Sequence, residues 1–154
     1  LGAADAAAVA DLAALATAAE LIGLGSAMLD LASEYAKSRK QFGRAIGAYQ
    51  AVKHHLADVA VAVEMARPLV WGAAVGLDGN APDSSAVAVS RDISAAKVAA
   101  ADAAYLASRR SLQVLGAIGY TAEHDLSLYL TKTRALVSAW GTPAQHRARI
   151  LETL

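Results

Sequence analysis

The sequence contains no cysteine, only 5% aromatic residues and three prolines. Without cysteine the chain has neither a disulfide framework nor a thiolate site, which fits a reducing compartment and predicts a cytoplasmic location. Because 56% of the residues are hydrophobic while aromatic side chains are scarce, the core must consist largely of alanine, valine and leucine. Alanine in this quantity favours helices and lets them approach one another closely.

The sequence also lacks net charge, since lysine plus arginine and aspartate plus glutamate both number 14. A neutral chain has no overall field that attracts nucleic acid or an anionic membrane. The basic clusters Arg109-Arg110 and Lys132-Thr133-Arg134 lack interleaved aromatic residues, so they do not indicate nucleic-acid binding. No run of about 18 apolar residues is free of charge, and we therefore expect no membrane span.

The chain begins at Leu1 rather than at methionine, and no basic segment precedes an apolar one. We therefore expect the sequence to be part of a longer protein that extends on its N-terminal side. Its 154 residues are enough for one domain with a sizeable core.

Hydrophobic residues recur every three or four positions over long stretches, which predicts helices. Gly23 and Gly25 in the first of these stretches predict a close crossing of a neighbouring helix. A turn over residues 41–46 and a loop over 78–83 separate the first three stretches. We expect helices over about residues 5–40, 47–77, 85–117, 123–139 and 143–152.

Several helix ends carry their own signals. Ser84 or Ser85 is placed to cap the third helix, and Gly116 is placed to end it. Thr142 followed by Pro143 begins the last helix. We find no strand pattern and no internal repeat. Long helices joined by short turns predict an all-α fold, an antiparallel up-down four-helix bundle with a short extra C-terminal helix.

The turn after the first helix carries more chemistry than a chain reversal needs. The guanidinium of Arg39 can hold a phosphate by two hydrogen bonds, although a cation at a helix end is also explained by the helix dipole. The amide of Gln41 can bond an oxygen of a ribose or phosphate, and the ring of Phe42 can shield the contact. We predict that this turn faces a ligand.

A second candidate ends the third helix, Gln113-Val114-Leu115-Gly116-Ala117-Ile118-Gly119-Tyr120. A run of small residues exposes backbone, so a ligand can reach main-chain groups there. An ordinary glycine cap explains the same run. No strand precedes it, which excludes a dinucleotide-binding fingerprint of the Rossmann kind.

Other kinds of site find little support. His54 and His55 are adjacent and point about 100° apart on a helix, and Asp58 is only a weak match for a helical metal pair. We expect His124 and His146 to be solvated or capping residues, and we predict no metal site. The serines have no histidine and aspartate in the arrangement of a serine hydrolase.

Together the two candidate stretches resemble the C-terminal helical domain of acyl-CoA dehydrogenases. The resemblance lies in residues 35–44, 49–58 and 113–121, covers nearly the whole chain, and is similar to actinobacterial members. It implies a flavoenzyme subunit in which an N-terminal helical domain and a middle β-domain precede this one. It also implies an oligomer that binds FAD and removes two hydrogens from the α and β carbons of an acyl-CoA thioester.

The resemblance further implies which residues meet the flavin. The turn would contact the FAD of a neighbouring subunit, and the second stretch would contact the adenosine diphosphate part of that same FAD. Ala117 stands where the family has a glycine, beside Gly116, and Thr142 would touch the subunit's own FAD. The implied contact residues are Arg39, Gln41, Phe42, Gln113, Gly116, Ala117 and Thr142.

The catalytic base is where the sequence departs from the family pattern. Trp140 stands at the usual position of the glutamate that removes the α proton, and Ala13 stands at the alternative position on the first helix. An indole has no basic lone pair and cannot accept a proton. Asp11 lies about half a turn away on a shorter side chain. The sequence therefore predicts no catalytic residue in this chain.

Several interpretations stay open at this point. The chain belongs to a FAD-supporting subunit whose partner supplies the glutamate, or to an active dehydrogenase with its base elsewhere. The subunits would then form a homo- or hetero-oligomer, a dimer of dimers. Two further alternatives are a helical module that serves oligomerisation only and a flavin-dependent monooxygenase of the same superfamily.

Overall fold

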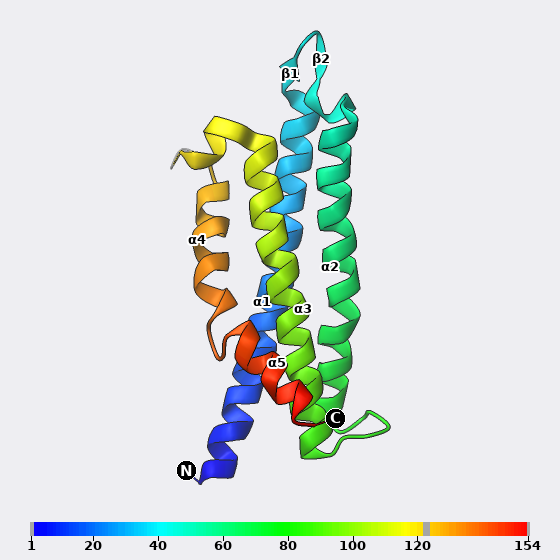
Figure 1. Cartoon of the computed structure of the whole chain (residues 1–154), viewed down its shortest axis with the longest axis vertical. Coiled ribbons are helices and arrows are strands. Elements are labelled where there is room, and N and C mark those ends of the chain that lie inside the picture. Colours follow the sequence, from blue (N-terminus) through cyan, green and yellow to red (C-terminus); the bar gives the residue numbers. More distant parts are fainter. Residues whose placement is uncertain (1, 122–123, 154) are drawn as a thin grey trace.

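A computed structural model describes residues 2–121 and 124–153 as a bundle of helices (Figure 1). In chain order the elements are α1 (Ala3–Ser38), β1 (Lys40–Gln41), β2 (Arg44–Ala45), η1 (Ile46–Ala48), α2 (Gln50–Leu77), α3 (Ala86–Leu115), η2 (Gly116–Tyr120), α4 (Leu126–Val137) and α5 (Pro143–Leu151). The predicted all-α bundle of four packed helices with a short C-terminal helix is confirmed.

Helix α3 is the centre of the bundle, since it packs along α1 and α2 and also contacts α4 and α5. Small side chains line its buried positions, and they let the neighbouring helices approach closely. Larger side chains fill the remaining space, with Leu21, Met28 and Ile93 all fully buried. The buried alanines of α3 are Ala88, Ala96, Ala100, Ala101, Ala103, Ala104 and Ala107.

The close crossing predicted in α1 occurs at one of the two glycines. A Cβ on Gly25 would lie 3.0 Å from Cγ2 of Val63 in α2, so only glycine leaves room there. At Gly23 a Cβ would have nothing within 4 Å, and that part of the prediction is wrong. Packing at one position of a helix says little about a position on another face, two residues earlier.

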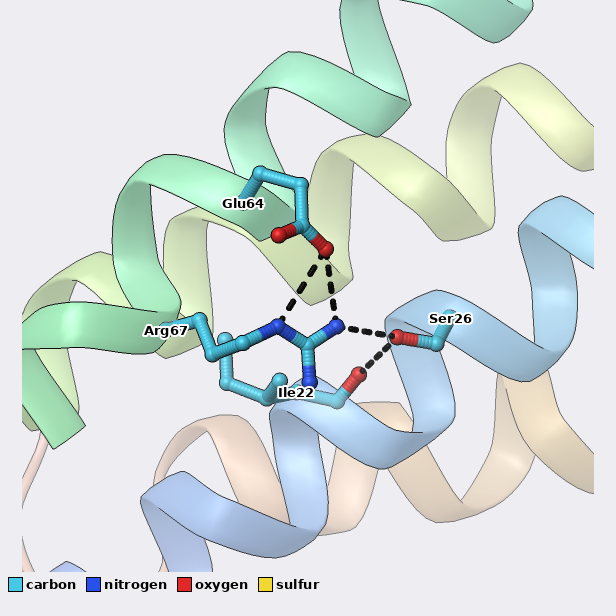
Figure 2. A network of polar contacts seen from close by, with 4 residues as sticks. All are labelled: Ile22, Ser26, Glu64 and Arg67. Atoms are coloured by element: carbon cyan, nitrogen blue, oxygen red, sulfur yellow. Dashed lines mark hydrogen bonds and ion pairs between the residues drawn. The ribbon is translucent and has the colours of Figure 1, made fainter. Parts of the chain in front are cut away.

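Polar side chains link α1 and α2 next to this crossing (Figure 2). Nη2 of Arg67 donates to Oε1 of Glu64 at 2.9 Å and to Oγ of Ser26 at 3.4 Å. The Ser26 hydroxyl in turn donates to the carbonyl of Ile22 at 3.0 Å. Because the Glu64 side chain is exposed, this pair orients Arg67 rather than adding much stability.

The sequence signals for the helix ends agree with the structure. Oγ of Ser85 accepts a hydrogen bond from the backbone N–H of Ala88, and Gly116 ends α3 with φ of 63°. Thr142 caps α5, and Pro143 occupies its first turn. Helix α4 is shorter than predicted, since it runs from Leu126 to Val137. The predicted start at residue 123 lies outside the described residues.

The turn after α1 corrects two predictions, because α1 ends at Ser38 and the following residues form a small hairpin. Strands β1 and β2 pair antiparallel, with Lys40 opposite Ala45 and Gln41 opposite Arg44. The absence of strands was therefore predicted wrongly. Two-residue strands are too short to show the alternating pattern by which a strand is detected in sequence.

The segments Asp5–Ser38 and Gln50–Leu77 are each long and apolar enough to cross a membrane, by length and composition alone. Core helices of soluble bundles pass the same test, and both segments pack along α3. The finding is therefore weak evidence, and the absence of a membrane span stays a prediction.

Candidate functional site

The hairpin stands at one end of the bundle, above α1 and α2 in Figure 1, and Tyr49 holds it in place. The Tyr49 hydroxyl donates to the carbonyl of Gln41 at 3.2 Å. Its ring meets the Phe42 ring edge-on, with centroids 6.4 Å apart, and the guanidinium carbon of Arg44 lies 4.0 Å from the Tyr49 centroid. These aromatic and cation–π contacts fix the hairpin to the start of α2.

The base of the hairpin rests directly on the end of α1. The backbone N–H of Ile46 donates to the carbonyl of Arg39 at 2.8 Å. At Gly47 a Cβ would lie 3.0 Å from the carbonyl oxygen of Ala36, so the close approach of η1 to α1 requires glycine. The hairpin is therefore a rigid extension of the bundle.

The tip of the hairpin is strained and exposed. Phe42 has φ of 52° and Gly43 has φ of 82°, the left-handed values that a two-residue hairpin turn needs. For a residue with a side chain this conformation costs about 1–2 kcal/mol. The Phe42 ring is nevertheless 91% exposed. Strain of this kind persists mainly where it serves a function, and here it presents an aromatic ring outside the fold.

Residues of both sequence motifs line one cavity of about 360 Å³ below the hairpin. Gln41 and Phe42 come from the hairpin, and Gln113 comes from the last turn of α3. The cavity thus joins two amides and an aromatic ring from opposite halves of the chain. Its other lining residues are Ile46, Tyr49, Ala51, Val52, His55 and Val114.

Two lining residues were missed as site residues by the sequence analysis. Tyr49 was expected on a core face, and His55 was expected to be solvated, but both are half-buried in the cavity wall. Their role depends on the hairpin that folds back over α2. No spacing in the sequence signals that contact.

The remaining predicted flavin contacts lie outside this cavity lining. Arg39 is exposed at the base of the hairpin, next to β1. Gly116 and Ala117 follow α3 within η2, and a Cβ on Gly116 would meet nothing within 4 Å. Thr142 lies near the opposite end of the bundle, at the start of α5 (Figure 1). This separation agrees with the implied contact of Thr142 to a different flavin from the one at the hairpin.

The α4–α5 turn, which carries Trp140, is held by a buried histidine. His146 is 2% exposed, and its Nε2 lies 3.1 Å from the carbonyl oxygen of Trp140. Its Nδ1 lies 3.1 Å from Oγ of Ser94 in α3. Since a carbonyl can only accept, Nε2 carries the hydrogen, and Nδ1 accepts from the Ser94 hydroxyl. Burial lowers the pKa of His146, which favours this neutral form.

The predicted solvated role of His146 is therefore wrong. Helix α5 folds back against α3, and this contact buries a residue whose neighbours along the chain are polar. The turn itself is also constrained, since Trp140 has φ of 58° and Gly141 has φ of 114°.

A buried lysine fixes the other side of the same turn. Lys97 in α3 is fully buried, and its Nζ donates to the carbonyls of Leu136 and Val137 at 3.2 Å and 2.8 Å. These carbonyls end α4 and have no partner within their own helix. Burial lowers the pKa of Lys97, because the charged form loses its hydration. Helix α3 thus anchors the end of α4 through Lys97 and the start of α5 through Ser94.

The structure engages the carboxylate closest in sequence to the expected base. Oδ1 of Asp11 accepts from Nη1 of Arg149 in α5 at 2.5 Å, and the Asp11 side chain is only 15% exposed. The same Arg149 nitrogen donates to Oγ of Ser90. Ala13 is half-buried in α1. Asp11 therefore has a structural role in joining α1 to α5.

Comparison with known proteins decides the family. Residues 2–154 match the family described as acyl-CoA dehydrogenase, C-terminal domain. The chain belongs to the acyl-CoA dehydrogenase family. Among its relatives, the acyl-CoA dehydrogenase IpdE2 of Mycolicibacterium smegmatis is 37% identical over 142 residues, which cover 92% of this chain and 42% of the relative. The acyl-CoA dehydrogenase FadE34 of Mycobacterium tuberculosis is 41% identical over 135 residues, covering 83% of this chain and 17% of the relative.

Solved acyl-CoA dehydrogenase structures have the same fold. The ChsE4-ChsE5 complex from Mycobacterium tuberculosis matches with a TM-score of 0.89 and 26% identity, over 98% of this chain and 40% of the solved chain. Butyryl-CoA dehydrogenase from Megasphaera elsdenii matches with a TM-score of 0.85 and 26% identity, over 95% of this chain and 37% of that one. The chain thus spans about two-fifths of the length of most of these acyl-CoA dehydrogenases.

Proposed function

We propose that this chain is the C-terminal helical domain of an FAD-dependent acyl-CoA dehydrogenase, and that it helps to hold the flavin without supplying the proton acceptor. The enzyme would remove two hydrogens from the α and β carbons of an acyl-CoA thioester. The observation that carries the proposal is the cavity in which Gln41 and Phe42 of one motif meet Gln113 of the other.

The residues at this end of the bundle fit part of an FAD molecule. Members of the family are FAD flavoproteins. The amides of Gln41 and Gln113 can bond ribose hydroxyls and phosphate oxygens, and the guanidinium of Arg39 can grip a phosphate by two hydrogen bonds. Gly116 leaves its backbone open to a ligand. FAD, when bound, accepts the hydride from the β carbon, whereas these residues only position it.

The proton acceptor would come from another chain or from another part of the protein. Trp140 and Ala13 occupy the two family positions of the glutamate, and neither side chain can take a proton. Asp11 is engaged by Arg149. The similarity to the ChsE4-ChsE5 complex, which consists of two different chains, supports a hetero-oligomer whose partner carries the glutamate.

Flavin retention tests the cofactor part of this proposal. We expect Arg39→Gln, in the intact protein purified with its cellular partners, to weaken FAD binding about tenfold, because a charge-assisted hydrogen bond to phosphate is lost. The bound flavin is measured by its absorbance per mole of protein. Arg147→Gln, which removes an exposed arginine paired with Asp102 on another face, serves as the control. Unchanged FAD affinity in the Arg39 variant would contradict the proposed contact.

Anaerobic mixing with acyl-CoA thioesters tests the missing base. We expect no bleaching of the flavin by a panel of acyl-CoAs unless a glutamate-bearing partner is present, since no group here can take the α proton. Absorbance at the flavin band is the measurement. Bleaching by this subunit alone would show that it has its own base. Oxygen consumption by the reduced flavin without acyl-CoA turnover would indicate a flavin-dependent monooxygenase instead.

One observation favours the alternative of a helical module that serves oligomerisation only. Helix α2 carries exposed apolar side chains at a spacing of about one turn, namely Val61, Met65, Leu69 and Val75. A continuous apolar stripe on a helix is suited to packing against another subunit. This function is compatible with flavin binding, and it stands alone only if the purified protein holds no flavin.

A further inference from the structure

A second, smaller groove lies between α3 and α4, and it shares no lining residue with the hairpin cavity. It has a volume of about 180 Å³. Its lining is unusually polar for a contact between two helices of this alanine-rich bundle. The lining residues are Tyr105, Ser108, Arg109, Leu112, Leu130, Thr133 and Arg134.

Thr133 lies at the bottom of this groove with an unused hydroxyl. The residue is 1% exposed, and its Oγ1 has no hydrogen-bond partner within residues 2–121 and 124–153. Thr17 and Thr131 show the usual solution, because each donates to the carbonyl four residues earlier, at 2.7 Å and 2.9 Å. A buried hydroxyl that loses water without gaining a partner is unfavourable, so its presence calls for an explanation.

Two arginines flank the same groove, one from each helix. Arg109 and Arg134 are both exposed, and neither forms an ion pair with a carboxylate in the part of the chain that the structure describes. Their sequence neighbours do, since Arg110 pairs with Asp58 and Lys132 pairs with Glu20. Two guanidinium groups beside one small cavity create a positive potential that favours an anion.

The available donors differ in kind and come from both helices. Each guanidinium offers a planar pair of N–H groups, the Thr133 hydroxyl offers one donor from below, and the Tyr105 hydroxyl belongs to the same lining. The Ser108 hydroxyl already donates to the carbonyl of Tyr105 at 2.7 Å. A tetrahedral oxyanion has oxygens enough to meet both guanidiniums and the hydroxyl at once, whereas a water molecule would satisfy Thr133 and leave the arginines unused.

We propose that the α3–α4 groove binds a phosphoryl oxyanion, held by Arg109, Arg134 and the buried hydroxyl of Thr133. The ligand is inorganic phosphate or a phosphate monoester whose organic part extends past Tyr105. This site lies on a different face of α3 from the hairpin cavity, so it is independent of the flavin contacts there.

Titration with inorganic phosphate tests the proposal. Ionic strength is kept constant with sodium chloride, and binding is followed by the backbone amide NMR shifts around Thr133. We expect saturable shifts with phosphate that chloride does not produce. Arg109→Gln and Arg134→Gln should each weaken phosphate binding about tenfold, as expected for a charge-assisted hydrogen bond. The matched control Arg147→Gln, in an exposed arginine of α5, should bind phosphate as the unmodified chain does.

Further arms separate the sources of the ligand and the role of the hydroxyl. Thr133→Val keeps the shape of the side chain and should weaken phosphate binding severalfold. Phenyl phosphate that binds more tightly than phosphate identifies a monoester as the ligand, and equal affinity identifies free phosphate. The proposal is overturned if phosphate shifts the amides no more than chloride does, or if both arginine variants bind phosphate unchanged. It is also overturned if Thr133→Val raises stability without affecting binding, since the hydroxyl then serves only a water molecule.

Discussion

Gly141→Ala should lower the free energy of unfolding by about 3 kcal/mol. Gly141 has φ of 114°, which side-chain-bearing residues rarely adopt, and an added Cβ would lie 2.6 Å from Nε2 of His146. His146 is buried and bonded on both ring nitrogens, so it cannot move aside without breaking its contact with Trp140 or Ser94. The cost combines backbone strain with the loss of a buried hydrogen bond. Urea denaturation followed by circular dichroism measures it.

Gly72→Ala is the matched control for this substitution. Gly72 lies in the interior of α2, it is exposed, and a Cβ there would have nothing within 4 Å. Alanine should stabilise the helix by about 0.5–1 kcal/mol, because glycine is the poorer helix former. If Gly141→Ala were as well tolerated as Gly72→Ala, the α4–α5 turn would not be fixed by His146 in the way the structure indicates.

Much of the fold is predictable because its signals are local. The helices follow from apolar periodicity, and the caps at Ser85, Gly116 and Thr142 follow from side chains that bond or free the adjacent backbone. The hairpin was missed since its turn depends on left-handed values at Phe42 and Gly43, and the sequence shows only that glycine permits them.

The candidate site was predictable only in part. Gln41 and Gln113 were expected to act together because both belong to motifs of one family, and the structure places both in one cavity wall. Contacts between distant segments left no trace in the sequence. His146 meets Ser94 only because α5 folds onto α3, and Tyr49 meets Gln41 only because the hairpin folds back. Such contacts depend on packing, to which local patterns are blind.

Helix α3 connects the two regions that matter for the proposed function. Gln113 at its end lines the hairpin cavity, while Ser94 and Lys97 near its start hold the turn that carries Trp140. In a domain that supports a flavin without providing a base, the α4–α5 turn still has to be held in one conformation. A buried cation at this place is a means of doing so, and its effect can be measured.

Lys97→Ala should destabilise the bundle by about 3 kcal/mol. The substitution leaves a cavity where a fully buried long side chain lay, and it leaves the carbonyls of Leu136 and Val137 without their charged donor. Relief from burying a cation, whose pKa is lowered by the lost hydration, offsets part of this loss. Urea denaturation gives the change in free energy, and amide hydrogen exchange at the end of α4 should rise.

Lys97→Met separates the two contributions, since methionine restores most of the buried volume but cannot donate to the carbonyls. We expect it to lose only about 1 kcal/mol, while hydrogen exchange at the end of α4 rises as in Lys97→Ala. The two variants would then share the loosened turn and differ in core packing. A methionine variant with normal exchange in α4 would show that packing alone, and not the bonds from Nζ, holds the end of that helix.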